Sequence, residues 1–180
     1  MTTLETDRLR IEQPNEGHFP FFTSCLTDPQ LINDSLGVLS AEQIRESFDR
    51  TLEHWRKHGF GQGIGVLKKS GKPIGIYGIK FIEIEGQNYL DPSALTITDY
   101  QKMGFAQEAM AGVIDSAFKV LRFEKVTALP SGKAALKLAE RAGFKFLRKV
   151  QREILGMTFT NLGLYELSRT DWENRKHRIS

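Results

Sequence analysis

Apolar and polar residues recur with regular periods along most of the chain, and these periods predict its secondary structure. Alternation over Leu9–Gln13 is typical of a half-buried strand, which Pro14 closes. Between Ser40 and Gly59 the spacing is helical, with Ser40 in the position of an N-cap and Gly59 as the stop. The apolar residues of that helix are Ile44, Phe48, Leu52 and Trp55.

The middle of the chain, Gly63–Thr98, is rich in β-branched and aromatic residues. The segments KSGK and EGQN interrupt it as turns, which predicts three consecutive antiparallel strands joined by hairpins. These strands are also unusually rich in glycine, and such glycines mark either bulges or the close approach of a ligand. The glycines are Gly61, Gly63, Gly65, Gly75 and Gly78.

Beyond Thr98 the pattern changes to alternating helices and strands. We predict a helix over Gly104–Leu121, a short strand over Glu124–Leu129, and a second helix that ends at Gly143. Two final strands follow at Phe144–Lys149 and Thr158–Ser168. This order predicts an α/β (α+β) fold with a mixed, largely antiparallel sheet and helices on both faces.

Length and composition fit one domain spanning residues 1–180. The 180 residues include 40% hydrophobic and 26% charged positions, as in soluble globular proteins, and no apolar run is long enough to span a membrane. Because the N-terminus is charged where a signal peptide would be apolar, we predict no export signal. Cys25, the single cysteine, excludes an internal disulfide and is compatible with a reducing cytoplasm, where we expect the protein.

The formal charge of +3 suits a phosphate-bearing ligand but is small for a domain of this size. Basic residues cluster only near the end, where we predict a solvated tail over residues 175–180. Because the chain lacks basic and aromatic residues interleaved on one surface, we predict no direct nucleic-acid contact. We also predict no metal, since the histidines have no metal-ligand spacing; they are His18, His54, His58 and His177.

The most informative segment is YQKMGFAQEAM, which starts at Tyr100. Gly104 and Ala106 stand at a helix start just beyond a strand, where unpaired backbone N–H groups and the helix dipole attract anions. Small residues would let phosphate oxygens reach those groups, and Gln101 and Lys102 would add donors. A tight strand-to-helix turn is the alternative explanation for the same residues.

The order of motifs resembles the RimJ/RimL-type branch of the GNAT N-acetyltransferase superfamily. QKMGFA is similar to that superfamily's pyrophosphate motif, Arg/Gln-x-x-Gly-x-Gly/Ala, and the following QEAM to its continuation. Four further segments resemble the branch in the same order: LETDRLRI at Leu4–Ile11, HGFGQGIGVLKKSGKPIGIYGI from His58, AERAGF at Ala139–Phe144, and YELSRTDW at Tyr165–Trp172.

This resemblance implies a sheet whose fourth and fifth strands splay apart, with acetyl-CoA as co-substrate in the gap. Ile97 and Thr98 would pair with its pantetheine. Backbone N–H groups would hold its pyrophosphate at Gln101, Lys102, Met103, Gly104, Phe105 and Ala106. The implied activity is acetyl transfer to a primary amine, first of all the N-terminal α-amine of a ribosomal or other protein. A small-molecule amine is the alternative acceptor.

The sequence departs from the family where the helix after the fifth strand begins. The usual Asn-x-x-Ser, which makes polar contacts near the CoA thiol, is replaced by Gly132 and Ala135. Ser131 and Lys133 are possible substitutes, and Lys133 is a candidate partner for a CoA phosphate. The loss leaves a second class of function open, a non-catalytic acyl-CoA-binding sensor.

Two residues are candidates for proton transfer. Asp91 stands where the family often keeps a glutamate base, although a turn aspartate before Pro92 is the alternative. Tyr165, on a late strand, is the candidate acid for the departing thiolate or else a core tyrosine. The resemblance places acceptor specificity at Asp28–Gly37 and Ile154–Gly163, where the residues have no readable pattern.

Overall fold

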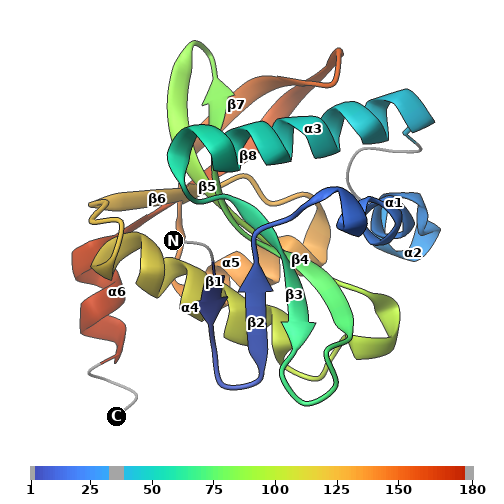
Figure 1. Ribbon diagram of the computed structural model, residues 1–180. Helices are drawn as coiled ribbons and strands as arrows, with labels where there is room; N and C mark the ends of the chain where they lie inside the picture. The colour runs from blue at the N-terminus through green and yellow to red at the C-terminus, as the bar shows by residue number, and fades with distance from the viewer. Residues whose placement is uncertain (1–2, 33–38, 177–180) are drawn as a thin grey trace.

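The computed structural model describes residues 3–32 and 39–176, which form two antiparallel sheets and the helices around them (Figure 1). The first sheet has the order β1–β2–β3–β4–β5, with strands Thr3–Glu5, Leu9–Glu12, Gln62–Leu67, Pro73–Ile84 and Gln87–Thr96. The second has the order β6–β8–β7, with strands Lys125–Ala128, Met157–Ser168 and Lys145–Ile154.

The helices are α1 (Phe19–Thr27), α2 (Pro29–Ile32), α3 (Ala41–His58), α4 (Phe105–Lys119), α5 (Gly132–Ala142) and α6 (Arg169–Lys176). Two short 3₁₀ helices, η1 (Glu16–His18) and η2 (Thr98–Tyr100), precede α1 and follow β5. Ser40 caps α3 through the predicted capping box with Gln43, and Gly59 ends it in the left-handed conformation. The two long helices of the second half also form as predicted.

The two sheets separate between β5 and β6, which are the strands predicted as the fourth and fifth. This separation confirms that these two strands splay apart. The strands still meet at one end, where the Thr127 hydroxyl donates to the Leu90 carbonyl (3.1 Å) and the Leu129 N–H donates to the Asp91 carboxylate (3.1 Å). Toward Thr96 no ladder joins β5 to β6 in the described chain. We call the meeting point, Leu90–Asp91 against Thr127–Leu129, the fork.

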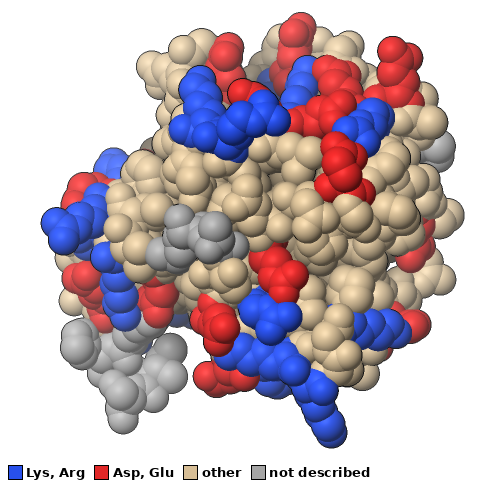
Figure 2. Space-filling model, viewed as in Figure 1, with Lys and Arg blue, Asp and Glu red and all other residues tan. Residues whose placement is uncertain are grey.

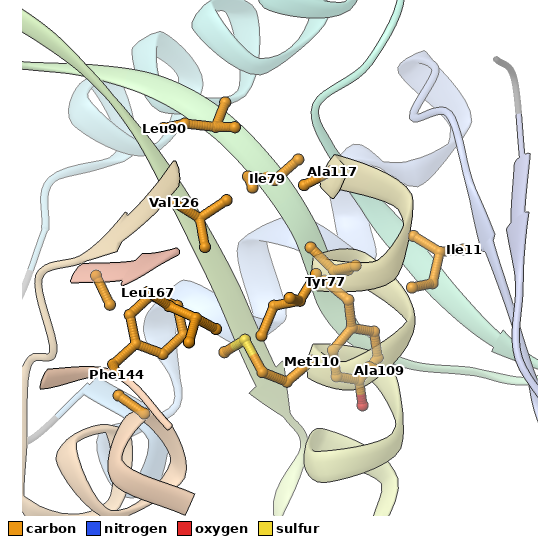
Figure 3. Close-up of a cluster of buried hydrophobic side chains, with 14 of the residues drawn as sticks. Ile11, Tyr77, Ile79, Leu90, Ala109, Met110, Ala117, Val126, Phe144 and Leu167 are labelled. Atoms are coloured by element: carbon orange, nitrogen blue, oxygen red, sulfur yellow. The ribbon is translucent and has the colours of Figure 1, made fainter. Parts of the chain in front are cut away.

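Helices cover both faces of the first sheet, as predicted. In Figure 1, α3 crosses in front of the strands while α4 and α5 pass behind them. One buried cluster joins α1 and α3 to β3 and β4 through Phe22, Phe48, Ile64 and Ile76. The larger cluster lies on the α4 side, where Figure 3 shows Tyr77, Ile79 and Leu90 facing Ala109, Met110 and Ala117.

Two of the strand glycines make room for one buried tyrosine rather than for a ligand. A Cβ added at Gly65 would lie 2.2 Å from the Tyr77 ring, and one added at Gly75 would lie 2.5 Å from its hydroxyl oxygen. The ring therefore lies flat across these two glycines, and its hydroxyl shares a buried hydrogen bond of 2.8 Å with the Thr96 side chain. Tyr77 thus fixes the end of β5, next to the predicted phosphate loop.

The predicted elements differ from the structure mainly at the two ends of the chain. Strand β1 and helices α1 and α2 were not predicted. The basic tail begins later than expected, because Arg175 and Lys176 belong to α6 and the Arg175 guanidinium donates to the Arg141 carbonyl. Residues 177–180, with His177, lie outside the described residues. No described helix is long and apolar enough to cross a membrane.

His54 joins α3 to the sheet through both of its ring nitrogens. The Phe81 N–H donates to Nε2 (3.0 Å), so Nδ1 carries the proton and donates to the Phe60 carbonyl (2.8 Å). The ring packs among His58, Phe60 and Phe81. Burial lowers the pKa of His54, and the hydrogen bond to Phe60 only partly offsets this effect. The native state therefore holds a neutral imidazole.

This arrangement predicts a loss of stability in mild acid. The unfolded chain takes up the proton near pH 6.5 and the native state resists it, so the free energy of unfolding should fall as the pH drops below about 6.5. His54→Asn should be less stable than wild type at pH 7.5, with a smaller difference at pH 5.5. Urea unfolding at the two pH values measures this, and an equal difference at both would contradict the assignment.

Candidate functional site

The predicted phosphate loop is exposed, and two of its residues have left-handed backbone conformations. Residues Gln101–Gly104 are all exposed between η2 and α4. Lys102 and Gly104 have positive φ angles of 61° and 85°, whereas Gln101 before them is extended. Gly104 is the N-cap of α4 and offers no side-chain cap, so no side chain of its own competes for the first helical N–H groups.

A hydrogen-bond network ties this loop to the N-terminal hairpin. The Glu108 carboxylate, in the first turn of α4, accepts from the Thr6 hydroxyl (2.5 Å), the Arg8 N–H (2.8 Å) and Arg8 Nε (2.6 Å). The Arg8 guanidinium also donates to the Met103 carbonyl (3.0 Å) and lies 4.1 Å from the Phe105 ring centre. Burial alone would raise the pKa of Glu108, but these hydrogen bonds outweigh it and lower that pKa.

The edge of β5 beside the gap exposes different backbone groups from those predicted. The Ile97 N–H donates to the Ile74 carbonyl (2.9 Å), and its carbonyl accepts from the Tyr100 N–H (2.9 Å). Ile97 is therefore turned toward β4, and Thr98 already belongs to η2. By the alternation of an antiparallel pair, Ala94 and Thr96 direct their N–H and C=O groups toward the gap. The predicted role of Ile97 does not fit this geometry, because its N–H and C=O groups are both occupied, and the pairing with pantetheine itself stays a prediction.

Asp91 lies at the fork, inside β5, so the alternative of a turn aspartate is wrong. Its carboxylate accepts the Leu129 N–H, and its register partner across β4 is Lys80. Burial raises the pKa of Asp91 to about 6, although the charge of Lys80 and the Leu129 hydrogen bond act against this shift. A carboxylate with this pKa is charged at neutral pH and can still accept a proton there.

Two cations are close enough for their charges to act on Asp91, although neither forms an ion pair with it within 4 Å among the described residues. Lys80 Nζ donates to Gln62 Oε1 (2.9 Å), and Gln62 Nε2 in turn donates to the Ser93 hydroxyl (2.7 Å). Arg152, on β7, is close enough for its charge to act on Lys80 and Asp91, and burial lowers the pKa of both basic groups. Its buried Nε has no hydrogen-bond partner among the described residues. Sequence reasoning missed both cations.

The remaining predicted residues lie on the other side of the fork. Tyr165, on β8, pairs with Ala128 at the end of β6, so the register brings it next to Leu129, the partner of Asp91. Its ring packs edge-on against Phe146 and joins the core on the α4 side. Lys133 is exposed in the first turn of α5. Gly132, the first residue of α5, has a φ of 85°, a conformation that Asn tolerates better than most residues.

The rest of the described chain adds no competing centre. It holds no group of three or more His, Cys, Asp or Glu side chains able to bind a metal. A surface groove of about 580 Å³ runs along α3 and is lined by charged residues and by His54 and His58. Figure 2 shows acidic and basic side chains intermixed over this helix, several of them paired, such as Arg45 with Glu16 and Asp49. None of the predicted site residues lines that groove.

Comparison with known proteins agrees with this geometry. Residues 8–145 match the acetyltransferase (GNAT) domain family, and the chain belongs to that family. A curated relative, the uncharacterized protein YkkB of Bacillus subtilis (strain 168), is 26% identical over 154 residues, which cover 84% of this chain and 90% of YkkB. The protein is therefore a GNAT N-acetyltransferase, a family that transfers acetyl groups from acetyl-CoA to amines.

Solved structures share the fold at low sequence identity. An acetyltransferase from Agrobacterium tumefaciens str. C58 has a TM-score of 0.79 and 21% identity, covering 94% of this chain and 95% of its own. A putative ribosomal-protein-serine acetyltransferase from Vibrio cholerae has a TM-score of 0.74 and 15% identity, with coverages of 92% and 97%. Spermidine N-acetyltransferase from Vibrio cholerae, in complex with CoA and spermine, has a TM-score of 0.68 and 15% identity, with coverages of 93% and 99%.

The loop geometry generates a prediction for Gly104→Val. A β-branched residue cannot hold a φ of 85° without strain, so the loop would change shape and displace the N–H groups at the start of α4. We expect acetyl-CoA binding to be lost in calorimetry while the domain stays folded. Gly86→Val is the matched control, because Gly86 has a similar φ of 77° in the distant β4–β5 turn. Unchanged affinity in Gly104→Val would place the phosphate site elsewhere.

Proposed function

We propose that the protein acetylates the N-terminal α-amine of a peptide or protein, as RimJ/RimL-type enzymes do. The observation that carries the proposal is Asp91 at the fork, with a pKa raised to about 6 by burial. An α-amino group, with a pKa near 8, needs only a modest base to become neutral, whereas a lysine side chain, near 10.4, needs a stronger one. The likeness to a putative ribosomal-protein-serine acetyltransferase supports this choice of acceptor.

The proposed reaction assigns a role to each part of the site. The N–H groups from Lys102 to Ala106 hold the pyrophosphate, because the Gln101 N–H already donates to the Thr98 carbonyl (3.1 Å). Ala94 and Thr96 pair with pantetheine in the gap. The neutral amine attacks the thioester carbonyl carbon, and its surplus proton passes to Asp91, directly or through water. The carbon–sulfur bond then breaks, and Tyr165 gives its hydroxyl proton to the departing thiolate. Lys133, exposed near the start of α5, remains a candidate for a CoA phosphate.

Specific observations support two alternative functions. A small-molecule amine is the alternative acceptor, as in the spermidine N-acetyltransferase that shares the fold. The exchange of the family's Asn and Ser for Gly132 and Ala135 favours a weakened or non-catalytic acyl-CoA-binding protein. Release of CoA thiol from acetyl-CoA, measured with a panel of peptides and amines, separates the three: peptide turnover, amine turnover, or binding without turnover.

The assigned proton transfers predict the effects of two conservative variants. Asp91→Asn and Tyr165→Phe should each lower kcat by about 10²–10⁴-fold, the usual contribution of general acid–base catalysis. The affinity for acetyl-CoA should barely change. Because Asp91 acts as a base, wild-type activity should decline as the pH falls through about 6, and this limb should disappear in Asp91→Asn. Full turnover in both variants would show that the assignments are wrong.

Restoring the family pattern provides a further test. Gly132→Asn together with Ala135→Ser should raise kcat, because the two polar groups would again contact the region of the CoA thiol. Asn at position 132 tolerates the left-handed φ, so the double variant should fold. Steady-state kinetics and calorimetry on the same samples decide the outcome. Tight CoA binding without turnover, before and after the change, would favour the sensor.

A further inference from the structure

We propose that Lys80 and Arg152 form an anion subsite for the acceptor, so that the enzyme prefers amines that carry a carboxylate close to the reacting nitrogen. This inference rests on the proposed function, because it places the acceptor amine at Asp91. For a peptide acceptor, the carboxylate would belong to an acidic side chain within the first two residues. The subsite consists of residues on β4 and β7 next to the fork, and it does not involve the predicted phosphate loop.

The two cations have hydrogen-bonding capacity to spare. Neither takes part in an ion pair within 4 Å among the described residues, although both are partly buried. Lys80 uses one donor on Gln62, and the buried Nε of Arg152 has no partner there. Buried donors are nearly always satisfied in native proteins, and an unsatisfied one is costly. An ionised carboxylate of the acceptor would satisfy these donors, because charge-assisted hydrogen bonds are stronger than hydrogen bonds between neutral groups.

The charge balance around the fork also favours an anion. The groups that act on Lys80 are one carboxylate, Asp91, and two further cations, Arg152 and Arg50. Arg50 is paired with Glu46 on the surface of α3 (2.5 Å), so the local surplus of positive charge comes from Lys80 and Arg152. An acceptor with a second ammonium group, such as spermidine, would bring another positive charge to this place and would be repelled.

The subsite lies within reach of the reacting amine. Lys80 and Asp91 are direct register partners across β4 and β5, and side chains opposite each other in an antiparallel pair are neighbours on one face. An amine at the Asp91 carboxylate would therefore have Lys80 beside it. A carboxylate bound by Lys80 and Arg152 must then be only a few bonds from that amine. This requirement excludes acidic groups far along a peptide.

The test compares matched acceptors. Peptides that begin Ser-Glu, Ser-Gln and Ser-Lys and are otherwise identical are assayed by CoA-thiol release, beside free γ-aminobutyrate and spermidine. Wild type should show a kcat/KM for the Ser-Glu peptide about 10- to 100-fold above that for Ser-Gln, as expected for a desolvated charge-assisted contact. Arg152→Gln and Lys80→Met should reduce this ratio toward one. Arg152→Glu should reverse the preference in favour of Ser-Lys.

Arg148→Gln is the matched control, because Arg148 lies on the same strand but pairs with Glu85 at the surface (2.7 Å). The ratio should stay at its wild-type value in this variant. Since the readout is a ratio, a general loss of activity does not imitate the effect, and circular dichroism confirms folding. Calorimetry of the acetylated Ser-Glu and Ser-Gln products gives the same comparison without turnover.

The outcomes separate the two proposals. Equal turnover of all three peptides would overturn the anion subsite and leave N-terminal acetylation standing. Turnover of γ-aminobutyrate without any peptide would retain the subsite and overturn the peptide acceptor. A preference for spermidine, or a ratio that survives Arg152→Gln and Lys80→Met, would overturn the subsite.

Discussion

The site depends above all on the carboxylate of Glu108. A single side chain accepts hydrogen bonds from Thr6 and from the backbone and guanidinium of Arg8, about a hundred residues away in sequence. Arg8 in turn holds the Met103 carbonyl and covers Phe105. The network therefore fixes the loop without using the N–H groups at the start of α4, which are the proposed phosphate ligands. Arg8 also pairs with a carboxylate whose charge would otherwise repel a pyrophosphate at the proposed site.

A second constraint holds the other side of the CoA gap. Tyr77 lies across Gly65 and Gly75 and reaches Thr96, the last residue of β5. The Thr96 carbonyl also accepts from the Gln101 side chain (3.2 Å), so the end of the strand and the beginning of the loop are fixed together. The sequence marked these strands as rich in glycine but left the cause open between bulges and a ligand. The pairing of β3 with β4 has a register shift between Gly65 and Val66, as expected for a bulge, and it also brings Gly65 and Gly75 to the same ring.

The features that could be predicted from the sequence are those encoded by residues close to one another in the chain. The capping box of α3, the stop at Gly143 and the small residues before α4 are local signals, and all three elements form as predicted. Helices α1 and α2 are short, which gives little periodicity to detect. The mismatch at Ile97 has another origin: the side of β5 to which a backbone group points depends on the hydrogen-bonding parity with β4, and a shift of one residue exchanges the two sides.

The difference between local and long-range information also explains why the sequence indicates a site for acetyl-CoA more clearly than a site for the acceptor. The proposed phosphate loop is one continuous segment, so a motif can describe it. The region around Asp91 is assembled from Gln62, Lys80 and Arg152 on three different strands, together with the Leu129 N–H after a fourth. None of these residues has a distinctive neighbour in sequence, and Lys80 and Arg152 stand in ordinary strand patterns where a lysine or arginine normally faces solvent. Only the fold brings them close enough for their charges to act on one carboxylate, and their burial strengthens the effect of these charges.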